Sequence, residues 1–234
     1  MNRAAGQSGP VRVLLVDDHP LVRQALRETI LRERDLAVCG EAEDRQRALA
    51  AMADCRPDLV IVDLALKNSD GLELITDIRL GYPGTRILVL SMYDGSHFAE
   101  RVIRAGANGY VSKQEAPTRI MQAVRKVLSG EIYWTEKVAA QVASKVVRPG
   151  LETRSLPCDL LSERELQVFE LIGTGASTSQ IAAALHLGVS TVESHRTHIR
   201  KKMHCGSAVE LLQAAIRWNL TARILGQARG TRGS

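Results

Sequence analysis

Residues 11–18 read Val-Arg-Val-Leu-Leu-Val-Asp-Asp, a short apolar run that ends in two acids. Further apolar runs lead to Asp63, Ser91 and Lys113. Apolar runs of this length between helical patterns are typical of buried parallel strands. In an open parallel sheet, the carboxyl ends of the strands gather the functional side chains at one edge. The pattern therefore predicts acids, a hydroxyl and an amine along a single sheet edge.

The first half of the chain is expected to form an α/β domain with a doubly wound, five-stranded parallel sheet. Right-handed crossovers between parallel strands place helices on both faces of such a sheet. The expected strands are 11–17, 36–41, 58–63, 86–91 and 108–112, and the expected helices are 20–33, 43–54, 70–80, 97–105 and 115–129.

From residue 161 onward the pattern predicts an all-α domain of four helices. Ser162 and Ser177 are each followed three residues later by Glu or Gln, a capping box that predicts the first two helix starts. Ser190 or Thr191 is expected to cap the third helix. The fourth is expected to start after Ser207 and to end near residue 218.

Domain boundaries are expected as follows: a flexible N-terminus 1–10, an α/β domain 11–130, a linker with a short helix 131–158, the helical domain 159–222 and a disordered tail 223–234.

Composition limits the class of protein. Apolar residues make up 45% and charged residues 24%, as in ordinary globular proteins, and the net charge is +5. No apolar stretch approaches the ~18 residues of a membrane span, and residues 1–10 lack the apolar segment of a secretory signal. We therefore expect a cytoplasmic protein without membrane contact. Cys39, Cys55, Cys158 and Cys205 lie far apart in the sequence, which favours reduced thiols over metal ligands.

The acids predict a site for a divalent cation and a phosphoryl group. Asp17, Asp18 and Asp63 offer the oxygen ligands that Mg²⁺ prefers, and the backbone carbonyl of Ala65 could add another. Asp63 is the expected nucleophile, because a carboxylate can accept a phosphoryl group. Lys113 would offset charge on the transferring oxygens. The Ser91 hydroxyl would donate to the new phosphoryl group. A lone Asp after a strand is usually a turn or helix cap, but this combination favours the phosphoryl site.

A basic helix over 190–203 predicts a second site, for DNA. Val192, Ile199 and Met203 recur at helical spacing and should face the core. A helix of this size fits the major groove of DNA, and flanking cations suit its phosphates. The alternative is a basic amphipathic helix in any small bundle. The expected DNA contacts are Thr191, Glu193, Ser194, Arg196, Thr197, Arg200, Lys201 and Lys202.

Residues 11–130 resemble the receiver domain of bacterial two-component response regulators. One departure is Gln114 after Lys113, where many receivers carry proline. The resemblance implies the sheet order 2-1-3-4-5. It also implies that Asp63 is the phospho-acceptor, Asp17 and Asp18 the acidic metal pair, and Ser91 and Tyr110 the switch positions. The stretches that carry it are Leu14-Leu-Val-Asp-Asp-His-Pro20, Asp58-Leu-Val-Ile-Val-Asp-Leu64, Ser69-Asp-Gly-Leu-Glu-Leu74, Leu90-Ser-Met92 and Ala105-Gly-Ala-Asn-Gly-Tyr-Val-Ser-Lys113.

Residues 160–218 resemble the LuxR-type helix-turn-helix of the NarL/FixJ family. By this resemblance, Glu193, Ser194 and Thr197 read bases. Gly188 stands where a Ser is common, and Ser190 where a Lys is frequent. The stretches that carry it are Leu161-Ser-Glu-Arg-Glu-Leu166, Ile181-Ala-Ala-Ala-Leu185 and Thr191-Val-Glu-Ser-His-Arg-Thr-His-Ile-Arg-Lys-Lys-Met203.

Together the resemblances imply a DNA-binding transcriptional regulator rather than a dedicated enzyme. A sensor histidine kinase, or a small donor such as acetyl phosphate, would phosphorylate Asp63. A homodimer would then bind inverted half-sites on double-stranded DNA, with RNA polymerase as a further candidate partner. Two alternatives stay open. A phosphohydrolase would need a second acid two residues after Asp63, where Ala65 stands. An adaptor would bind protein, not DNA, through its helical domain.

Overall fold

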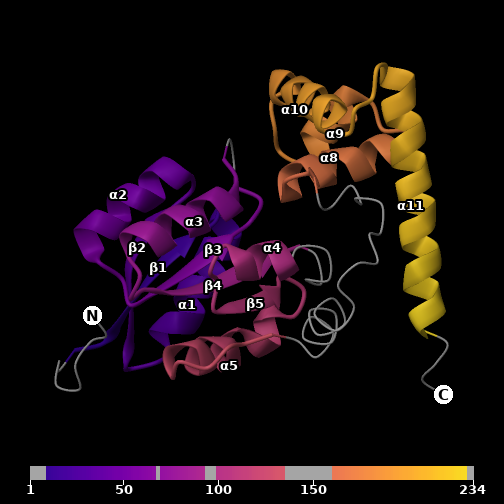
Figure 1. The fold of residues 1–234 in the computed structure, drawn as a ribbon. Helices are drawn as coiled ribbons and strands as arrows, with labels where there is room; N and C mark the ends of the chain where they lie inside the picture. The colour runs from indigo at the N-terminus through magenta and orange to yellow at the C-terminus, as the bar shows by residue number, and fades with distance from the viewer. Residues whose placement is uncertain (1–8, 67–68, 93–98, 135–159, 231–234) are drawn as a thin grey trace. The chain divides into compact units, whose positions relative to one another are not determined.

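A computed structural model describes residues 9–66, 69–92, 99–134 and 160–230 of the chain (Figure 1). The chain divides into two compact units, Met1–Leu151 and Glu152–Ser234. No helix in the described parts is both long and apolar enough to cross a membrane. Most of the predicted flexible N-terminus, and all but the first four residues of the predicted linker, lie outside the described residues.

The first unit contains the predicted five-stranded parallel sheet, in the order β2-β1-β3-β4-β5. Every residue of the central strand β3 is buried, because helices cover both faces of the sheet. The strands end close to their predicted limits. They are β1 (Val11–Val16), β2 (Leu36–Ala42), β3 (Leu59–Asp63), β4 (Arg86–Ser91) and β5 (Gly109–Ser112).

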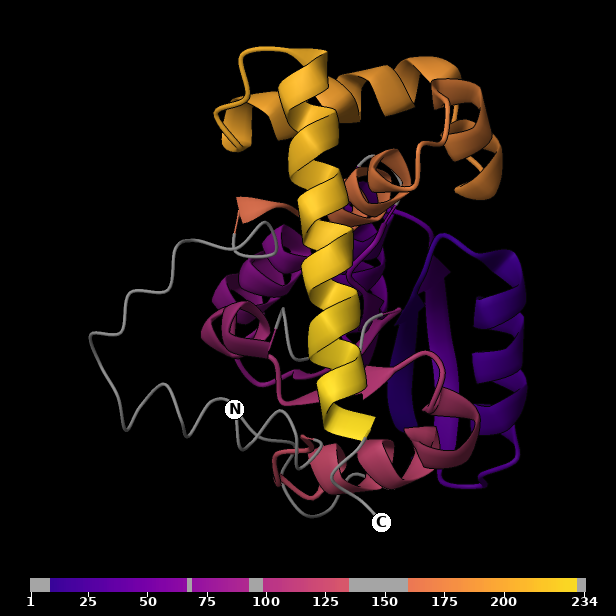
Figure 2. The ribbon, with the colours of Figure 1, turned by 90° about the vertical axis from the view of Figure 1, so that its right-hand side faces the viewer.

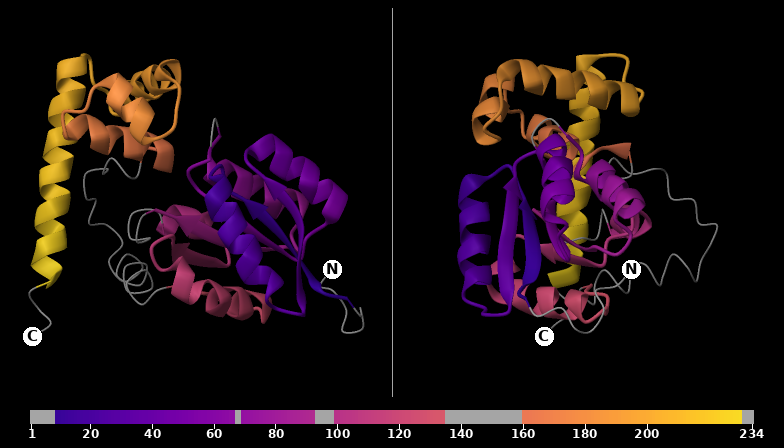
Figure 3. Two further views of the ribbon diagram at one scale, coloured as in Figure 1. Left: turned by 180° about the vertical axis from the view of Figure 1, so that it is seen from behind. Right: turned by 90° about the vertical axis from the view of Figure 1, so that its left-hand side faces the viewer.

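Helices lie on both faces of this sheet, as Figure 3 shows. Helices α1 (Pro20–Leu31) and α5 (Ala116–Leu128) cover one face. On that side, alternate strand residues such as Val13, Leu15 and Ile61 pack against aliphatic side chains of the two helices. The other helices of the unit are α2 (Arg45–Cys55), α3 (Gly71–Gly81) and α4 (Ala99–Arg104).

The second unit consists of four helices, as predicted: α8 (Glu163–Gly173), α9 (Thr178–Ala184), α10 (Val189–Lys202) and α11 (Ala208–Gly230). Both predicted capping boxes form, at Ser162 and Ser177. The predicted start of α10 is wrong. Its N-cap is Gly188, not Ser190 or Thr191, because the carbonyl of Gly188 already accepts the first helical hydrogen bond, from Val192.

Helix α11 is longer than predicted. It runs for 23 residues to Gly230, and Figure 2 shows it extending well past the other three helices of its unit. The predicted helix end near residue 218 and the predicted disorder over 223–230 are therefore wrong. A glycine costs a helix only about 1 kcal/mol, and extending an existing helix is much easier than nucleating one. The remaining tail residues, 231–234, lie outside the described residues.

Candidate functional site

The predicted acids meet at the carboxyl edge of the sheet. Asp17 and Asp18 follow β1, and Asp63 ends β3. One ligand atom from each of these carboxylates and from His19 can be chosen so that all four lie within 4.8 Å of one another. Asp17 and Asp63 are almost completely buried. We call these four residues the acid pocket.

Lys113 joins two carboxylates of the acid pocket. Its Nζ lies 2.7 Å from Oδ2 of Asp63 and 2.8 Å from Oδ2 of Asp17. Burial opposes the charge of this ammonium, but the two carboxylates outweigh it and raise the pKa of Lys113 above its ordinary value. The backbone N–H of Lys113 also donates to the carbonyl of Ser91, at 2.7 Å. Lys113 is therefore held in place both at its backbone and at its ammonium group.

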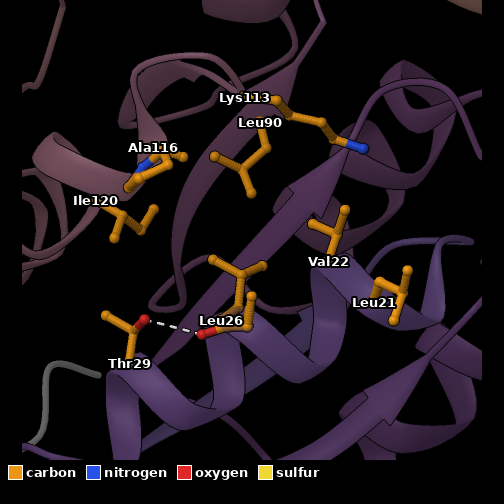
Figure 4. A pocket seen from close by; sticks show the side chains of 10 residues that line it. Leu21, Val22, Leu26, Thr29, Leu90, Lys113, Ala116 and Ile120 are labelled. Atoms are coloured by element: carbon orange, nitrogen blue, oxygen red, sulfur yellow. Dashed lines mark hydrogen bonds between the residues drawn. The ribbon is translucent and has the colours of Figure 1, made fainter.

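The aliphatic stem of Lys113 lies in apolar surroundings. It lines a groove of about 380 Å³ between α1 and α5, together with residues such as Val22 and Ile120. Figure 4 shows the ammonium pointing away from this groove. Apolar contact with the stem and ionic contact with the head thus favour the same side-chain position.

Asp63 is the least accessible member of the acid pocket. Burial raises the pKa of Asp63 to about 6, although the ammonium of Lys113 opposes this effect. The N–H of Ala65 donates to Oδ1 of Asp63 at 3.2 Å. The use of the Ala65 carbonyl as a metal ligand stays a prediction.

Gly71, the first residue of α3, forms part of the wall next to Asp63. A Cβ atom added at this glycine would lie 2.5 Å from the Cα of Leu64 and 2.6 Å from the carbonyl oxygen of Asp63. Real Cβ atoms do not approach other atoms so closely. Only glycine allows the start of α3 to pack on the end of β3 at this distance.

His19 is a member of the acid pocket that sequence reasoning missed. Its Nδ1 lies 2.7 Å from Oδ1 of Asp18 and 3.1 Å from Oδ1 of Asp17. Hydrogen bonds with Asp17 and Asp18 raise the pKa of His19 to about 9. Burial opposes ionisation of Asp17, but the bonds from His19 and the charge of Lys113 hold the pKa of Asp17 below its ordinary value. The feature of the sequence that could have indicated this role is the position of His19 directly after Asp17 and Asp18.

The donors of the acid pocket fit a hard divalent cation. Asp17, Asp18 and Asp63 supply carboxylate oxygens from two adjacent strands, which is the ligand type such ions prefer. His19 and Lys113 supply positive charge beside these carboxylates. A bound cation would therefore compete with these two side chains for the same oxygens.

The predicted switch residues are buried on neighbouring strands. Ser91 ends β4, and Tyr110 lies in β5, where it pairs with Val89. Both side chains are fully buried. The peptide bond between Lys113 and Gln114 is trans. The structure thus places both residues near the pocket edge of the sheet, while their role as a switch stays a prediction.

Helix α10 has the predicted apolar and polar sides. Val192 and Ile199 are fully buried, and Met203 just beyond the helix is half-buried. The side chains predicted to contact bases and phosphates fall into an exposed group and a half-buried group. Exposed are Glu193, Ser194, Thr197, Lys201 and Lys202, and half-buried are Thr191, Arg196 and Arg200.

Several of these side chains also make contacts within the helical unit. Nζ of Lys202 lies 2.6 Å from Oε2 of Glu165, a buried carboxylate of α8. Arg200 donates to the carbonyl of Gly206 at 2.9 Å. Glu193 accepts a hydrogen bond from the Thr178 hydroxyl at 2.7 Å. The sequence did not predict the contacts of Glu165 and Thr178 with α10, because these residues lie on other helices.

Sequence comparison assigns both units. The family model of the response regulator receiver domain matches residues 13–125, and that of the luxR family of bacterial regulatory proteins matches residues 159–215. Oxygen regulatory protein NreC of Staphylococcus epidermidis is 32% identical over 215 residues, covering 90% of this chain and 99% of the relative. The chain belongs to the two-component response regulators of the NarL/FixJ family. Its α/β unit is a receiver domain, and its helical unit is a LuxR-type DNA-binding domain.

Solved structures of response regulators support this assignment. A LuxR-family regulator from Aurantimonas is 36% identical with a TM-score of 0.55, over 60% of this chain and all of that chain. RcsB from Salmonella enterica is 25% identical with a TM-score of 0.54, over 88% of this chain and 98% of that one. That RcsB structure is bound to a promoter in the presence of the phosphomimetic BeF₃⁻. The likeness to RcsB extends over both domains of this response regulator.

Proposed function

We propose that this response regulator is switched by Mg²⁺-dependent phosphorylation of Asp63, with a sensor histidine kinase as donor. The observation that carries the proposal is the buried contact of Lys113 with both Asp63 and Asp17. One carboxylate oxygen of Asp63 attacks the donor phosphorus, and the donor leaves as the P–O bond forms. Lys113 stabilises charge on the phosphoryl oxygens in the transition state. Mg²⁺ at Asp17, Asp18 and Asp63 would supply further stabilisation of this charge.

The proposed response is binding of α10 in the major groove of DNA. A homodimer binds inverted half-sites, with Glu193, Ser194 and Thr197 facing base edges. Support comes from RcsB, which has been solved on a promoter and as two dimers bound to two parallel DNAs. RNA polymerase is a further proposed partner, and the cytoplasm is the proposed location because the DNA of bacteria lies there.

We assign the acid pocket a signalling role rather than the turnover of a small substrate. The residue two positions after Asp63 is Ala65, whose side chain cannot donate a proton to a leaving group or activate water. The phosphoryl group should therefore remain on Asp63 long enough to change DNA binding. A phosphohydrolase would instead release it rapidly.

Labelling with acetyl phosphate and Mg²⁺ tests this proposal. The full chain should gain one phosphoryl group on Asp63, and the Asp63→Asn variant or removal of Mg²⁺ should abolish the label. BeF₃⁻ should raise DNA affinity of the wild type and leave Asp63→Asn unchanged. Equal labelling of both proteins, or unchanged DNA affinity with BeF₃⁻, would contradict the proposal. Rapid multiple turnover of acetyl phosphate would favour the phosphohydrolase.

A further inference from the structure

The receiver domain holds a pair of thiols outside the acid pocket. Sγ of Cys39 lies 2.8 Å from Sγ of Cys55, and both are free cysteines. Cys39 lies in β2, and Cys55 is the last residue of α2. The sulfurs of a formed disulfide are about 2.05 Å apart. A small shift of the two side chains would therefore bring the sulfurs to bonding distance.

A β-bulge gives Cys39 its position. Val13 of β1 pairs with Val38, but the next residue, Leu14, pairs with Gly40. Cys39 is thus the extra residue on the bulged strand. A bulge changes the direction of a side chain and bends its strand. The edge strand β2 therefore carries a local irregularity at the residue whose sulfur meets α2.

The residue after Cys39, Gly40, also lies beside Cys55. A Cβ atom added at Gly40 would lie 3.1 Å from Cδ1 of Leu14 and 3.6 Å from Sγ of Cys55. On the helix side, α2 ends directly after Cys55, because Arg56 takes the left-handed conformation with φ 41°. Bulge, glycine and helix end all lie within one residue of a cysteine of the pair.

We propose that Cys39 and Cys55 form an oxidation site that closes reversibly to a disulfide in the presence of a disulfide oxidant such as oxidised glutathione. Cys39 is half-buried and Cys55 is buried, so Cys39 reacts first. Its thiolate attacks one sulfur of glutathione disulfide, forming a mixed disulfide and releasing one glutathione thiolate. The thiolate of Cys55 then attacks the sulfur of Cys39 and releases the second. The two protons lost by the protein protonate the two glutathione thiolates, and two electrons pass to the oxidant.

The two steps should differ in rate. Burial, together with the neighbouring Cys55, raises the pKa of Cys39 to about 12. Little thiolate is then present at neutral pH, which makes the first step slow. The second step is intramolecular between sulfurs already in contact, so it is fast. The mixed disulfide should therefore not accumulate.

Mass spectrometry of the oxidised full chain tests the proposal. The protein is incubated with excess oxidised glutathione, alkylated and digested without reduction. We expect a peptide that links Cys39 to Cys55, two hydrogen masses below the sum of its parts, which disappears after reduction. Cys39→Ser should lose this link, and Cys205→Ser should retain it. The link should be at least about tenfold more abundant in native protein than in urea, where Cys158 and Cys205 compete.

Three results would overturn the proposal. The first is alkylation of both Cys39 and Cys55 in native protein under conditions that oxidise Cys205. The second is a stable glutathione adduct on Cys39 or Cys55 without the link between them. The third is the same mixture of links in native and urea-treated protein, because the folded geometry would then contribute nothing.

Discussion

The ammonium of Lys202 lies 2.6 Å from the carboxylate of Glu165, which ties the last turn of α10 to the first turn of α8. Glu165 also accepts the backbone N–H of Ser162 in the capping box. The carboxylate side chain is 6% exposed, whereas that of Lys202 is 44% exposed. One buried acid thus caps one helix and holds the end of another. Lys202 and its exposed neighbour Lys201 should consequently have different roles.

Substitution of the two lysines separates these roles. Lys202→Met should destabilise the LuxR-type domain by about 1–2 kcal/mol, because Glu165 would lose its counter-ion while remaining buried. Lys201→Met should change the free energy of unfolding by less than about 0.5 kcal/mol. The Lys201→Met substitution should also lower the slope of log affinity for DNA against log salt concentration by about 1. Urea unfolding measures the change in stability, and DNA binding at several salt concentrations measures the change in slope. Equal losses of stability would show that the contact with Glu165 is unimportant.

The stability of the metal-free receiver should depend on His19 in alkaline solution. Its pKa rises from an ordinary value of 6.5 to about 9 on folding. The stabilisation from protonated His19 is therefore complete below pH 6.5 and is lost as the pH rises through about 9. His19→Gln should flatten the pH dependence of the unfolding free energy across this window. An unchanged slope in the variant would assign the dependence to other groups.

The same imidazolium should weaken Mg²⁺ binding. Protonated His19 occupies carboxylate oxygens of Asp17 and Asp18 that a divalent cation would use. Mg²⁺ should consequently bind more tightly as the pH rises toward 9, and His19→Gln should bind it several-fold more tightly than wild type at pH 7. Calorimetric titration of the phosphate-free protein measures this difference. Weaker binding by the variant would instead indicate that His19 assists the metal.

Thr178 should influence which base Glu193 selects. Its hydroxyl donates to Oε1 of Glu193 at 2.7 Å and so restricts the direction of the carboxylate. Thr178→Val should relax base preference at one operator position a few-fold, while Thr178→Ser should preserve it. Selection of bound sequences from a random DNA pool measures the preference. An unchanged profile for Thr178→Val would show that the carboxylate is oriented by other means.

Gly173 should be essential for the packing of α8 on α11. A Cβ atom there would lie 2.5 Å from the carbonyl oxygen of Ala215 and from Nδ2 of Asn219. Gly173→Ala should therefore destabilise the LuxR-type domain by about 2–3 kcal/mol. Gly81→Ala is the matched control, because no heavy atom lies within 4 Å of the added carbon. That control should be neutral or stabilising by up to about 1 kcal/mol in thermal unfolding.

The sheet and the acid pocket could be predicted because their signals are local in the chain. Strands buried on both faces produce continuous apolar runs, so the ends of those runs in the sequence predict the ends of β3 and β4. Asp63 and Lys113 stand at or just after strand ends, and parallel topology brings such ends together. The capping boxes at Ser162 and Ser177 involve residues only three positions apart. In each case the sequence signal consists of a few neighbouring residues.

The missed contacts depend on register and side-chain direction. Lys202 meets Glu165 across 37 positions, and no periodic pattern marks that pair. Cys39 meets Cys55 at a bulge that shifts the pairing of β2 by one residue, and no pattern in the sequence marks that bulge. The length of α11 was missed for another reason. Glycines near its end indicated disorder, although a helix that has already formed can continue through them.

The contact of Gly71 with the backbone of Asp63 and Leu64 has a mechanical consequence. No side chain lies between the start of α3 and the end of β3 at this point, so the junction contains no compressible layer. A displacement of the backbone beside Asp63, the proposed phospho-acceptor, should therefore move the start of α3 with it.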